Sequence, residues 1–281
     1  MKVIHTLKDM QLTSLQLKLN GKKIGFVPTM GYLHEGHMSL VEKAKEDNDV
    51  VVLSIFVNPL QFGPNEDFES YPRDFNRDEQ VAKEHGVDII FYPSVEEMYP
   101  QELNVKAVCL QRTDVLCGKS RVGHFDGVVT VLTKLFNIVM PSKAYFGKKD
   151  AQQVAIVDGL IKDFNFPIEL IAVDTVREQD GLAKSSRNVY LTEQERMEAP
   201  ELYRSLKIGQ QMIDEGERNP ITVVQTIKNH IQQHTSGVID YVEIYSYPDL
   251  RPLTELKGHV ILAIAVKFSK ARLIDNITLT V

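Results

Sequence analysis

The sequence Ile-Gly-Phe-Val-Pro-Thr-Met-Gly-Tyr-Leu-His-Glu-Gly-His occupies residues 24–37 and predicts the start of a β-α-β unit. Residues 24–27 form a short apolar run, and residues 28–33 form a connection rich in turn-forming residues. Residues 38–46 then have the apolar spacing of an amphipathic helix, and residues 50–57 form a fully apolar strand. We therefore expect the fold to be organised around this unit.

The candidate chemistry of this unit lies between its first strand and its helix, in His34-Glu35-Gly36-His37. Two histidines at this spacing near a helix N-terminus can face the same way, beside unpaired backbone N–H groups and the positive end of the helix dipole. Such a place can hold a phosphate, and Gly36 leaves the backbone room to approach it. Taken alone, the pattern fits histidines that only cap a helix equally well.

A second candidate for phosphate binding is Ala183-Lys184-Ser185-Ser186-Arg187-Asn188, which follows an apolar strand expected at 168–176. It places two cations and two hydroxyls in one loop, which suits a polyphosphate, although a solvated basic loop is the commoner explanation of such a pattern. A histidine-glycine-histidine turn after the first strand and a Lys-Ser-Ser loop after the last strand are together typical of adenylate-forming nucleotidyltransferases.

With these motifs in place, the sequence resembles the pantothenate synthetase (pantoate–β-alanine ligase) family of the HIGH/KMSKS-type nucleotidyltransferase superfamily. The resemblance rests on six blocks in the family's order, at residues 27–37, 54–62, 71–73, 123–128, 146–153 and 184–188. It implies ATP-dependent condensation of (R)-pantoate with β-alanine to give pantothenate, AMP and pyrophosphate through a pantoyl adenylate.

The order of the elements predicts an α/β protein with a Rossmann-like doubly wound parallel sheet and a second, smaller α+β domain. Apolar strands alternate with helices in the first part of the chain, which implies parallel pairing with right-handed crossovers. The expected helices lie at 9–19, 75–85, 126–140 and 150–164, the further strands at 87–92, 105–110, 143–146 and 168–176, and an irregular loop at 58–67.

The pattern changes after residue 187. Thr192-Glu193-Gln194-Glu195 is a capping box that opens a helix. Helices are expected at 201–215 and 221–234, and strands at 239–245, 260–268 and 273–281. We therefore expect residues 1–176 to form the nucleotidyltransferase domain that binds ATP and pantoate, and residues 177–281 to form an α+β domain that covers the active site.

The composition fits an ordinary globular enzyme. The chain has 281 residues, 43% hydrophobic and 25% charged, which favours two domains or one large domain with an appendage. A net charge of -6 argues against a nucleic-acid-binding surface. We expect a cytoplasmic protein, because no bilayer-spanning stretch or signal-peptide core is visible. Cys109 and Cys117 lack zinc-ligand or disulfide spacing and are expected to be ordinary thiols.

The resemblance implies roles for particular residues. It assigns catalysis to His34, His37, Lys149, Ser185 and Arg187, with His37 resembling the proton-donating histidine of the family. The implied ATP contacts are Met30, Gly31, Tyr32, Leu33, His34, Glu35, Gly36 and His37, then Gly147, Lys148, Lys149 and Asp150, then Val176, and finally Lys184, Ser185, Ser186 and Arg187. Gln61 and Gln153 resemble the pair that holds pantoate, and Gln61 is also expected to bind β-alanine.

Other features of the site are less strongly indicated. Arg121 and His124 are weaker candidates for the region of the acyl substrate. Mg2+ is expected to travel with the ATP phosphates, and Asp78 is a speculative carboxylate for it, since a solvated helix face is the commoner explanation of such a residue. A homodimer is an expectation carried by the resemblance.

Three other functions stay open at this point. A related nucleotidylyltransferase would leave AMP on its product, but Gln61, Gln153 and a second domain favour a ligase. An aminoacyl-tRNA synthetase would use the same two signatures, but this chain is short and acidic and shows no anticodon-binding region. A regulatory module could bind ATP without turnover. AMP release that requires both pantoate and β-alanine would distinguish the enzyme from such a module.

Overall fold

The computed structural model describes residues 1–64 and 66–281, and Asn65, which falls in the loop expected at 58–67, lies outside the described residues. The chain divides into two compact units. Unit 1 comprises Met1–Leu110, Arg121–Lys148 and Ile156–Asp174, and unit 2 comprises Gln111–Ser120, Lys149–Ala155 and Thr175–Val281. None of the helices in the described ranges has the length and apolar character that crossing a bilayer requires.

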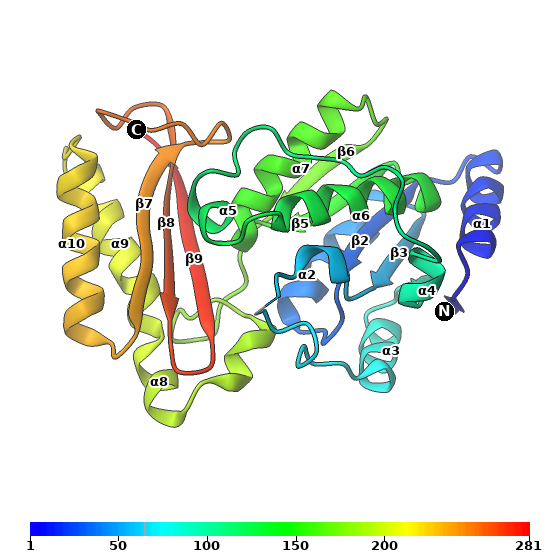
Figure 1. Ribbon diagram of the computed structural model, residues 1–281, viewed down its shortest axis with the longest axis horizontal. Coiled ribbons are helices and arrows are strands. Elements are labelled where there is room, and N and C mark those ends of the chain that lie inside the picture. The colour runs from blue at the N-terminus through cyan, green and yellow to red at the C-terminus, as the bar shows by residue number, and fades with distance from the viewer. Residues whose placement is uncertain (65) are drawn as a thin grey trace. The chain divides into compact units, whose positions relative to one another are not determined.

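Unit 1 is built on a six-stranded sheet whose paired strands all run parallel (Figure 1). The strands are β1 (Lys2–Ile4), β2 (Ile24–Thr29), β3 (Val50–Ile55), β4 (Ile89–Phe91), β5 (Lys143–Gly147) and β6 (Glu169–Val173), in the order β1-β4-β3-β2-β5-β6. The strand order reverses at β2, which pairs with β3 on one side and β5 on the other. Open α/β sheets bind ligands beyond the carboxyl ends of the strands at such a switch point.

Helices cover both faces of this sheet, as a doubly wound fold requires. The helical segments that lie wholly in unit 1 are α1 (Leu7–Leu19), α2 (Glu35–Asp47), the 3-10 turn η1 (Pro59–Gln61), α3 (Phe75–Glu84), α4 (Val95–Met98) and α6 (His124–Val139). Successive residues of a strand face opposite sides. Val27 packs in one core with Val41 of α2, whereas the ring of its neighbour Phe26 meets that of Phe136 in α6, 6.4 Å away.

One expectation for unit 1 is wrong, and one of its strands was not predicted. Residues 105–110 were expected to form a strand, but the structure gives them no regular secondary structure. Their backbone is bound by side chains of α6: the Ala107 amide donates to Thr130 Oγ1 at 3.1 Å, and the Cys109 amide donates to Asp126 Oδ1 at 2.9 Å. The sequence also missed the edge strand β1, which has only 3 residues.

Cys109 and Cys117 are free thiols, as expected.

Unit 2 is an α+β unit with a three-stranded antiparallel sheet in the order β7-β8-β9. Its elements are α5 (Leu116–Ser120), η3 (Ser186–Tyr190), α8 (Glu193–Glu198), α9 (Pro200–Asp214), α10 (Pro220–His234), β7 (Val238–Ser246), β8 (His259–Lys267) and β9 (Arg272–Thr280). The turn η2 (Lys148–Asp150) and α7 (Ala151–Asp163) each begin in one unit and end in the other. Leu206 of α9 and Ile227 of α10 pack with Leu262 of β8 in one buried core.

The predicted capping box at the start of α8 is confirmed. The Glu195 amide donates to Thr192 Oγ1 at 3.3 Å, and the Thr192 amide donates to Glu195 Oε2 at 2.9 Å. The second carboxylate oxygen of Glu195 accepts the Ser269 amide at 2.8 Å. This helix start is therefore tied to the segment between β8 and β9.

Candidate active site

The turn between β2 and α2 has a backbone conformation that few residues adopt. Gly31 has φ +84° and Tyr32 has φ +50°. A Cβ on Gly31 would lie 2.9 Å from Asp78 Oδ2 and 3.0 Å from Ile55 Cγ2, so only glycine fits here. A non-glycine residue in the left-handed region costs on the order of 1–3 kcal/mol, so surrounding contacts must hold Tyr32 in place. The conformations of Gly31 and Tyr32 therefore fix the path of the backbone that leads into His34.

His34 and His37 lie at the N-terminus of α2, which begins three residues earlier than expected, at Glu35. His34 Nδ1 accepts the Gly36 amide at 3.1 Å, and the His34 amide lies 3.4 Å from His37 Nδ1. The ring centroids are 4.1 Å apart. A neutral histidine that accepts a hydrogen bond on Nδ1 carries its proton on Nε2. Each ring therefore presents an N–H donor at the positive end of the helix dipole, which suits an anion.

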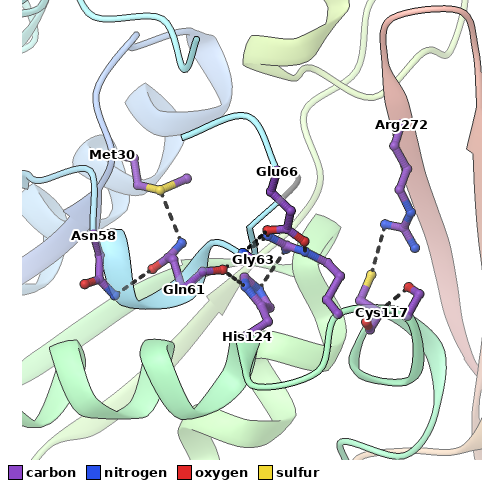
Figure 2. Close-up of polar contacts among 10 residues, drawn as sticks. Met30, Asn58, Gln61, Gly63, Glu66, Cys117, His124 and Arg272 are labelled. Atoms are coloured by element: carbon purple, nitrogen blue, oxygen red, sulfur yellow. Dashed lines mark hydrogen bonds and ion pairs between the residues drawn. The ribbon is translucent and has the colours of Figure 1, made fainter. Parts of the chain in front are cut away.

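Gln61 follows the carboxyl end of β3, and its amide is oriented by neighbours (Figure 2). Its Oε1 accepts from Asn58 Nδ2 at 3.2 Å, and its Nε2 lies 3.2 Å from the sulfur of Met30. Asn58 is 1% exposed, donates to the Gly127 carbonyl at 3.1 Å and accepts from the Tyr99 hydroxyl at 2.9 Å. Two residues expected at the substrate, Met30 and Gln61, therefore lie in contact within unit 1.

The turn that carries Gln61 lies directly against α6 at Gly127. A Cβ on Gly127 would lie 2.6 Å from the Gln61 backbone nitrogen and closer still to the Leu60 carbonyl. Any larger residue would push the turn off the helix. The sequence block around residue 127 therefore has a packing role that its motif alone did not reveal.

Arg121 and His124 also contact the turn that carries Gln61. The Arg121 guanidinium binds both carboxylate oxygens of Glu66, at 2.7 and 2.6 Å, and lies 3.0 Å from His124 Nε2. His124 Nδ1 donates to the Gln61 carbonyl at 2.7 Å. Burial raises the pKa of Glu66, but Arg121, the Gly63 amide and His124 together outweigh burial and hold that pKa below its ordinary value. Both residues contact protein groups around Gln61, which gives these two weaker candidates a positioning role.

The carboxyl end of β5 carries the next predicted ATP contacts. Gly147 ends the strand, and Lys148 Nζ forms an ion pair with Asp174 Oδ1 at 2.6 Å. In unit 2, Lys149 Nζ lies 3.8 Å from Asp150 Oδ2. The Lys149 carbonyl accepts from Asn276 Nδ2 of β9 at 2.8 Å. The sequence missed Asn276, because nothing near it in the chain indicates that it holds this lysine.

The Lys-Ser-Ser loop is fixed within unit 2. The Lys184 amide donates to the Val176 carbonyl at 2.9 Å, which joins two of the expected ATP contacts. Lys184 Nζ lies 3.0 Å from Glu178 Oε2. Ser185 Oγ accepts the Arg187 amide at 3.3 Å, and Ser186 is 9% exposed. Contacts within unit 2 thus define the backbone of this loop.

Arg177, which sequence reasoning also missed, anchors the segment that leads into this loop. Its guanidinium binds both carboxylate oxygens of Asp275 in β9, at 2.6 and 2.9 Å, and lies 3.6 Å from the ring centroid of Tyr203. Asp275 is 4% exposed. Charge-assisted bidentate pairs of this kind have strong geometric preferences. No local sequence signal links positions so far apart.

Gln153 lies in the first turn of α7 and is partly exposed. Its neighbour Gln152 is 6% exposed and donates to the carbonyls of Arg112 and Val115, at 2.8 Å each. The Gln152 side chain thus stabilises unit 2. Gln153 is the one of the two whose side chain stays accessible to a ligand.

The fold engages the carboxylate that was expected to hold magnesium. Across residues 1–64 and 66–281, no group of three or more His, Cys, Asp or Glu side chains could hold a metal. Asp78, the expected carboxylate, is 1% exposed, and each of its oxygens accepts a backbone amide at 2.7 Å. Mg2+ usually keeps several waters and is bound by one or two carboxylates together with substrate phosphates. Both oxygens of Asp78 already accept backbone amides, so Asp78 is not placed to be such a carboxylate.

The parallel sheet has a switch point at β2, and the helix that follows β2 carries two N–H donors at its N-terminus. Together these features define a nucleotide-binding α/β protein. The comparison with known families identifies it further. Residues 2–278 match the family model described as pantoate-beta-alanine ligase. The chain belongs to the pantoate-beta-alanine ligase family.

Relatives and solved structures agree with this assignment. The chain is 67% identical to a pantothenate synthetase of Geobacillus sp. (strain WCH70) over 279 residues, 99% of each chain. It is 63% identical to the pantothenate synthetase of Bacillus cytotoxicus over 281 residues, all of both chains. The crystal structure of pantothenate synthetase from Thermus thermophilus matches with a TM-score of 0.93 at 42% identity, covering 99% of each chain. A Francisella tularensis pantoate-beta-alanine ligase, complexed with beta-gamma ATP and beta-alanine, matches with a TM-score of 0.82 at 36% identity, covering 99% of this chain and 97% of that one.

Proposed function

We propose that this protein is an AMP-forming ligase that condenses (R)-pantoate with β-alanine. Pantoate attacks the α-phosphorus of ATP to give pantoyl adenylate and pyrophosphate, and β-alanine then displaces AMP to give pantothenate. The observation that carries this proposal is the pair of histidine N–H donors at the N-terminus of α2, beyond the switch-point strand, in a chain of this family.

The main obstacle in the first step is electrostatic, because a carboxylate must approach a polyanion. Donors and cations that are already in place lower this barrier most effectively, because they need no reorganisation as charge develops. We propose that His34, His37 and the amides at the start of α2 bind the phosphates and stabilise the charge that develops on them. Lys149, Ser185 and Arg187 are proposed to take part in catalysis, and Lys184 and Ser186 to bind ATP.

Substrate recognition is proposed to involve the two glutamines. Neutral amides bind hydroxyls and a carboxylate without cancelling the charge that makes the carboxylate a nucleophile. Gln61, whose amide is oriented by Asn58 and Met30, is proposed to contact pantoate and then β-alanine. Gln153 is proposed to hold pantoate. Of the remaining expected ATP contacts, Asp150 is proposed to bind the ribose and the backbone at Val176 to lie near the adenine.

Mg2+ is proposed to enter bound to the phosphates of ATP, where it neutralises part of their charge. We also propose that the protein is a homodimer in the cytoplasm, as the sequence led us to expect. Of these three proposals, the homodimer rests on the resemblance to the family.

The decisive experiment is isotope exchange. Labelled pyrophosphate should enter ATP when pantoate is present and β-alanine is absent, and the full reaction should release AMP. Exchange should fall by about 10²-fold in Gln153→Ala, since displacing a reacting atom by about 1 Å can cost that much. Asp158→Asn, at another partly exposed position of the same helix, is the matched control. Release of ADP, or exchange that requires β-alanine, would refute the adenylate mechanism.

A further inference from the structure

The amides of Tyr32 and Leu33 both point at one anion. Successive N–H groups beside left-handed residues form a concave site that binds phosphates and carboxylates in many proteins. Here Gly31 and Tyr32 supply the positive φ angles, and the anion is the carboxylate of Asp78. Tyr32 N donates to Oδ2 and Leu33 N donates to Oδ1, each at 2.7 Å. We call these two amides, with the Asp78 carboxylate between them, the turn clamp.

The turn clamp is closed to solvent. Asp78 comes from the first turn of α3, which follows β3, and it is 1% exposed. Arg77 completes the arrangement, since its Nη1 lies 3.5 Å from Asp78 Oδ1 and its guanidinium lies 5.0 Å from the ring centroid of Tyr32. The two hydrogen bonds and this cation offset part of the cost of burying a charge.

We propose that Asp78 is a positioning residue, an internal anion that occupies the phosphate-binding site of the turn and thereby directs ATP to His34, His37 and the amides that follow. The carboxylate therefore shapes the nucleotide site without touching metal or nucleotide. The inference rests on the proposed function for its link to ATP, but the turn clamp itself is a property of the free protein.

The geometry separates this role from that of a metal ligand. A magnesium ligand must present an oxygen to the ion, about 2.0–2.1 Å from it. Both oxygens of Asp78 instead face backbone amides that hold Tyr32 in its left-handed conformation. It follows that the amides of Tyr32 and Leu33 do not bind ATP phosphates, although both residues belong to the segment expected to bind ATP.

The first test needs no variant and no substrate. Amide hydrogen exchange of the wild-type protein, without ATP or metal, should show the Tyr32 and Leu33 amides strongly protected. Exchange at the rate of solvent-exposed amides would overturn the proposal. This measurement is independent of activity, so it stands even if the proposed reaction is not catalysed.

The second test uses Asp78→Asn, which keeps the size of the side chain but turns one acceptor into a donor. The variant loses a hydrogen bond between a backbone amide and a charged carboxylate. We therefore expect kcat/KM for ATP to fall about 10- to 100-fold, chiefly through a higher KM. The Mg2+ concentration for half-maximal rate should stay within about twofold of wild type, because the variant removes no metal ligand. A raised Mg2+ requirement, with activity restored by excess Mg2+, would overturn the proposal in favour of a metal ligand.

Asp74→Asn is the matched control for these kinetics. Asp74 is the neighbouring carboxylate that caps the same helix, accepting the Arg77 amide at 3.1 Å, and asparagine caps helices equally well. Its kcat/KM for ATP should stay within about twofold of wild type, because no contact to the turn is removed. An equal loss in both variants would show that damage to α3, and not the turn clamp, causes the effect. If the wild-type protein shows no pantoate-dependent exchange, the proposed function fails and hydrogen exchange alone decides the turn clamp.

Discussion

Gly127→Ala is the substitution whose effect follows most directly from the structure. A methyl group at this position would lie 2.6 Å from the Gln61 backbone nitrogen, whereas ordinary contacts begin at 3.4 Å. The methyl group is fixed to the helix backbone and the atoms that it meets are backbone atoms, so neither side can rotate away. The turn must move by at least about 0.8 Å, and further to clear the Leu60 carbonyl, or the helix must shift. Displacements of about 1 Å can cost 10²-fold in rate, or about 2.7 kcal/mol at 1.36 kcal/mol per tenfold.

The assay is pantoate-dependent exchange of pyrophosphate into ATP, with pantoate varied at saturating ATP and then ATP varied at saturating pantoate. We expect kcat/KM for pantoate to fall by about 10²-fold in Gly127→Ala, while KM for ATP changes by less than about threefold. Asn137→Ala, at an exposed position of the same helix, should leave both constants unchanged. A Gly127→Ala protein with normal pantoate kinetics would mean that the position of the Gln61 turn does not control the reaction, and the reasoning would be refuted.

The remaining predictions concern catalysis, pH and assembly. His37→Ala should fold normally yet lose adenylate formation by about 10²-fold or more, and turnover within about threefold of wild type would contradict its role. Hydrogen bonds from the Thr192 and Ser269 amides lower the pKa of Glu195 from 4.5 to about 2. The stability that this carboxylate adds is therefore complete above pH 4.5 and is lost as the pH falls towards 2, so the Tm difference between wild type and Glu195→Gln should shrink over that range. A difference that stays constant with pH would contradict this assignment. Light scattering should give twice the mass of one chain, and a monomer at micromolar concentration would disprove the dimer.

Local patterns predicted the parallel sheet because each apolar strand is followed by a helix with its own apolar stripe. The same logic placed His34 and His37 at a helix N-terminus, although the helix begins at Glu35 and not at Met38. Gly36 has low helix propensity, so periodicity alone did not extend the helix through it. Boundaries of this kind are set by capping contacts that involve the histidines themselves.

The failures come from contacts between distant parts of the chain. Residues 105–110 have the composition of a strand, yet Thr130 and Asp126 bind their amides in place of a neighbouring strand. The surroundings of Asp78 could not be inferred either, because the amides it binds lie 45 and 46 residues earlier. From the sequence alone, a carboxylate on an amphipathic helix is expected to face solvent. Its burial becomes apparent only when the distant segment that packs against it is known.

The contacts of β9 have a consequence for the order in which the protein becomes functional during synthesis. Asp275 binds Arg177 at the base of the Lys-Ser-Ser loop, and Asn276 binds the Lys149 carbonyl. A nascent chain that has reached only residue 270 lacks both anchors, although every proposed catalytic side chain has already been translated. Strand β9 must therefore leave the ribosome before unit 2 can hold these segments in place. A protease that trims β9 would inactivate the enzyme without removing a single catalytic group.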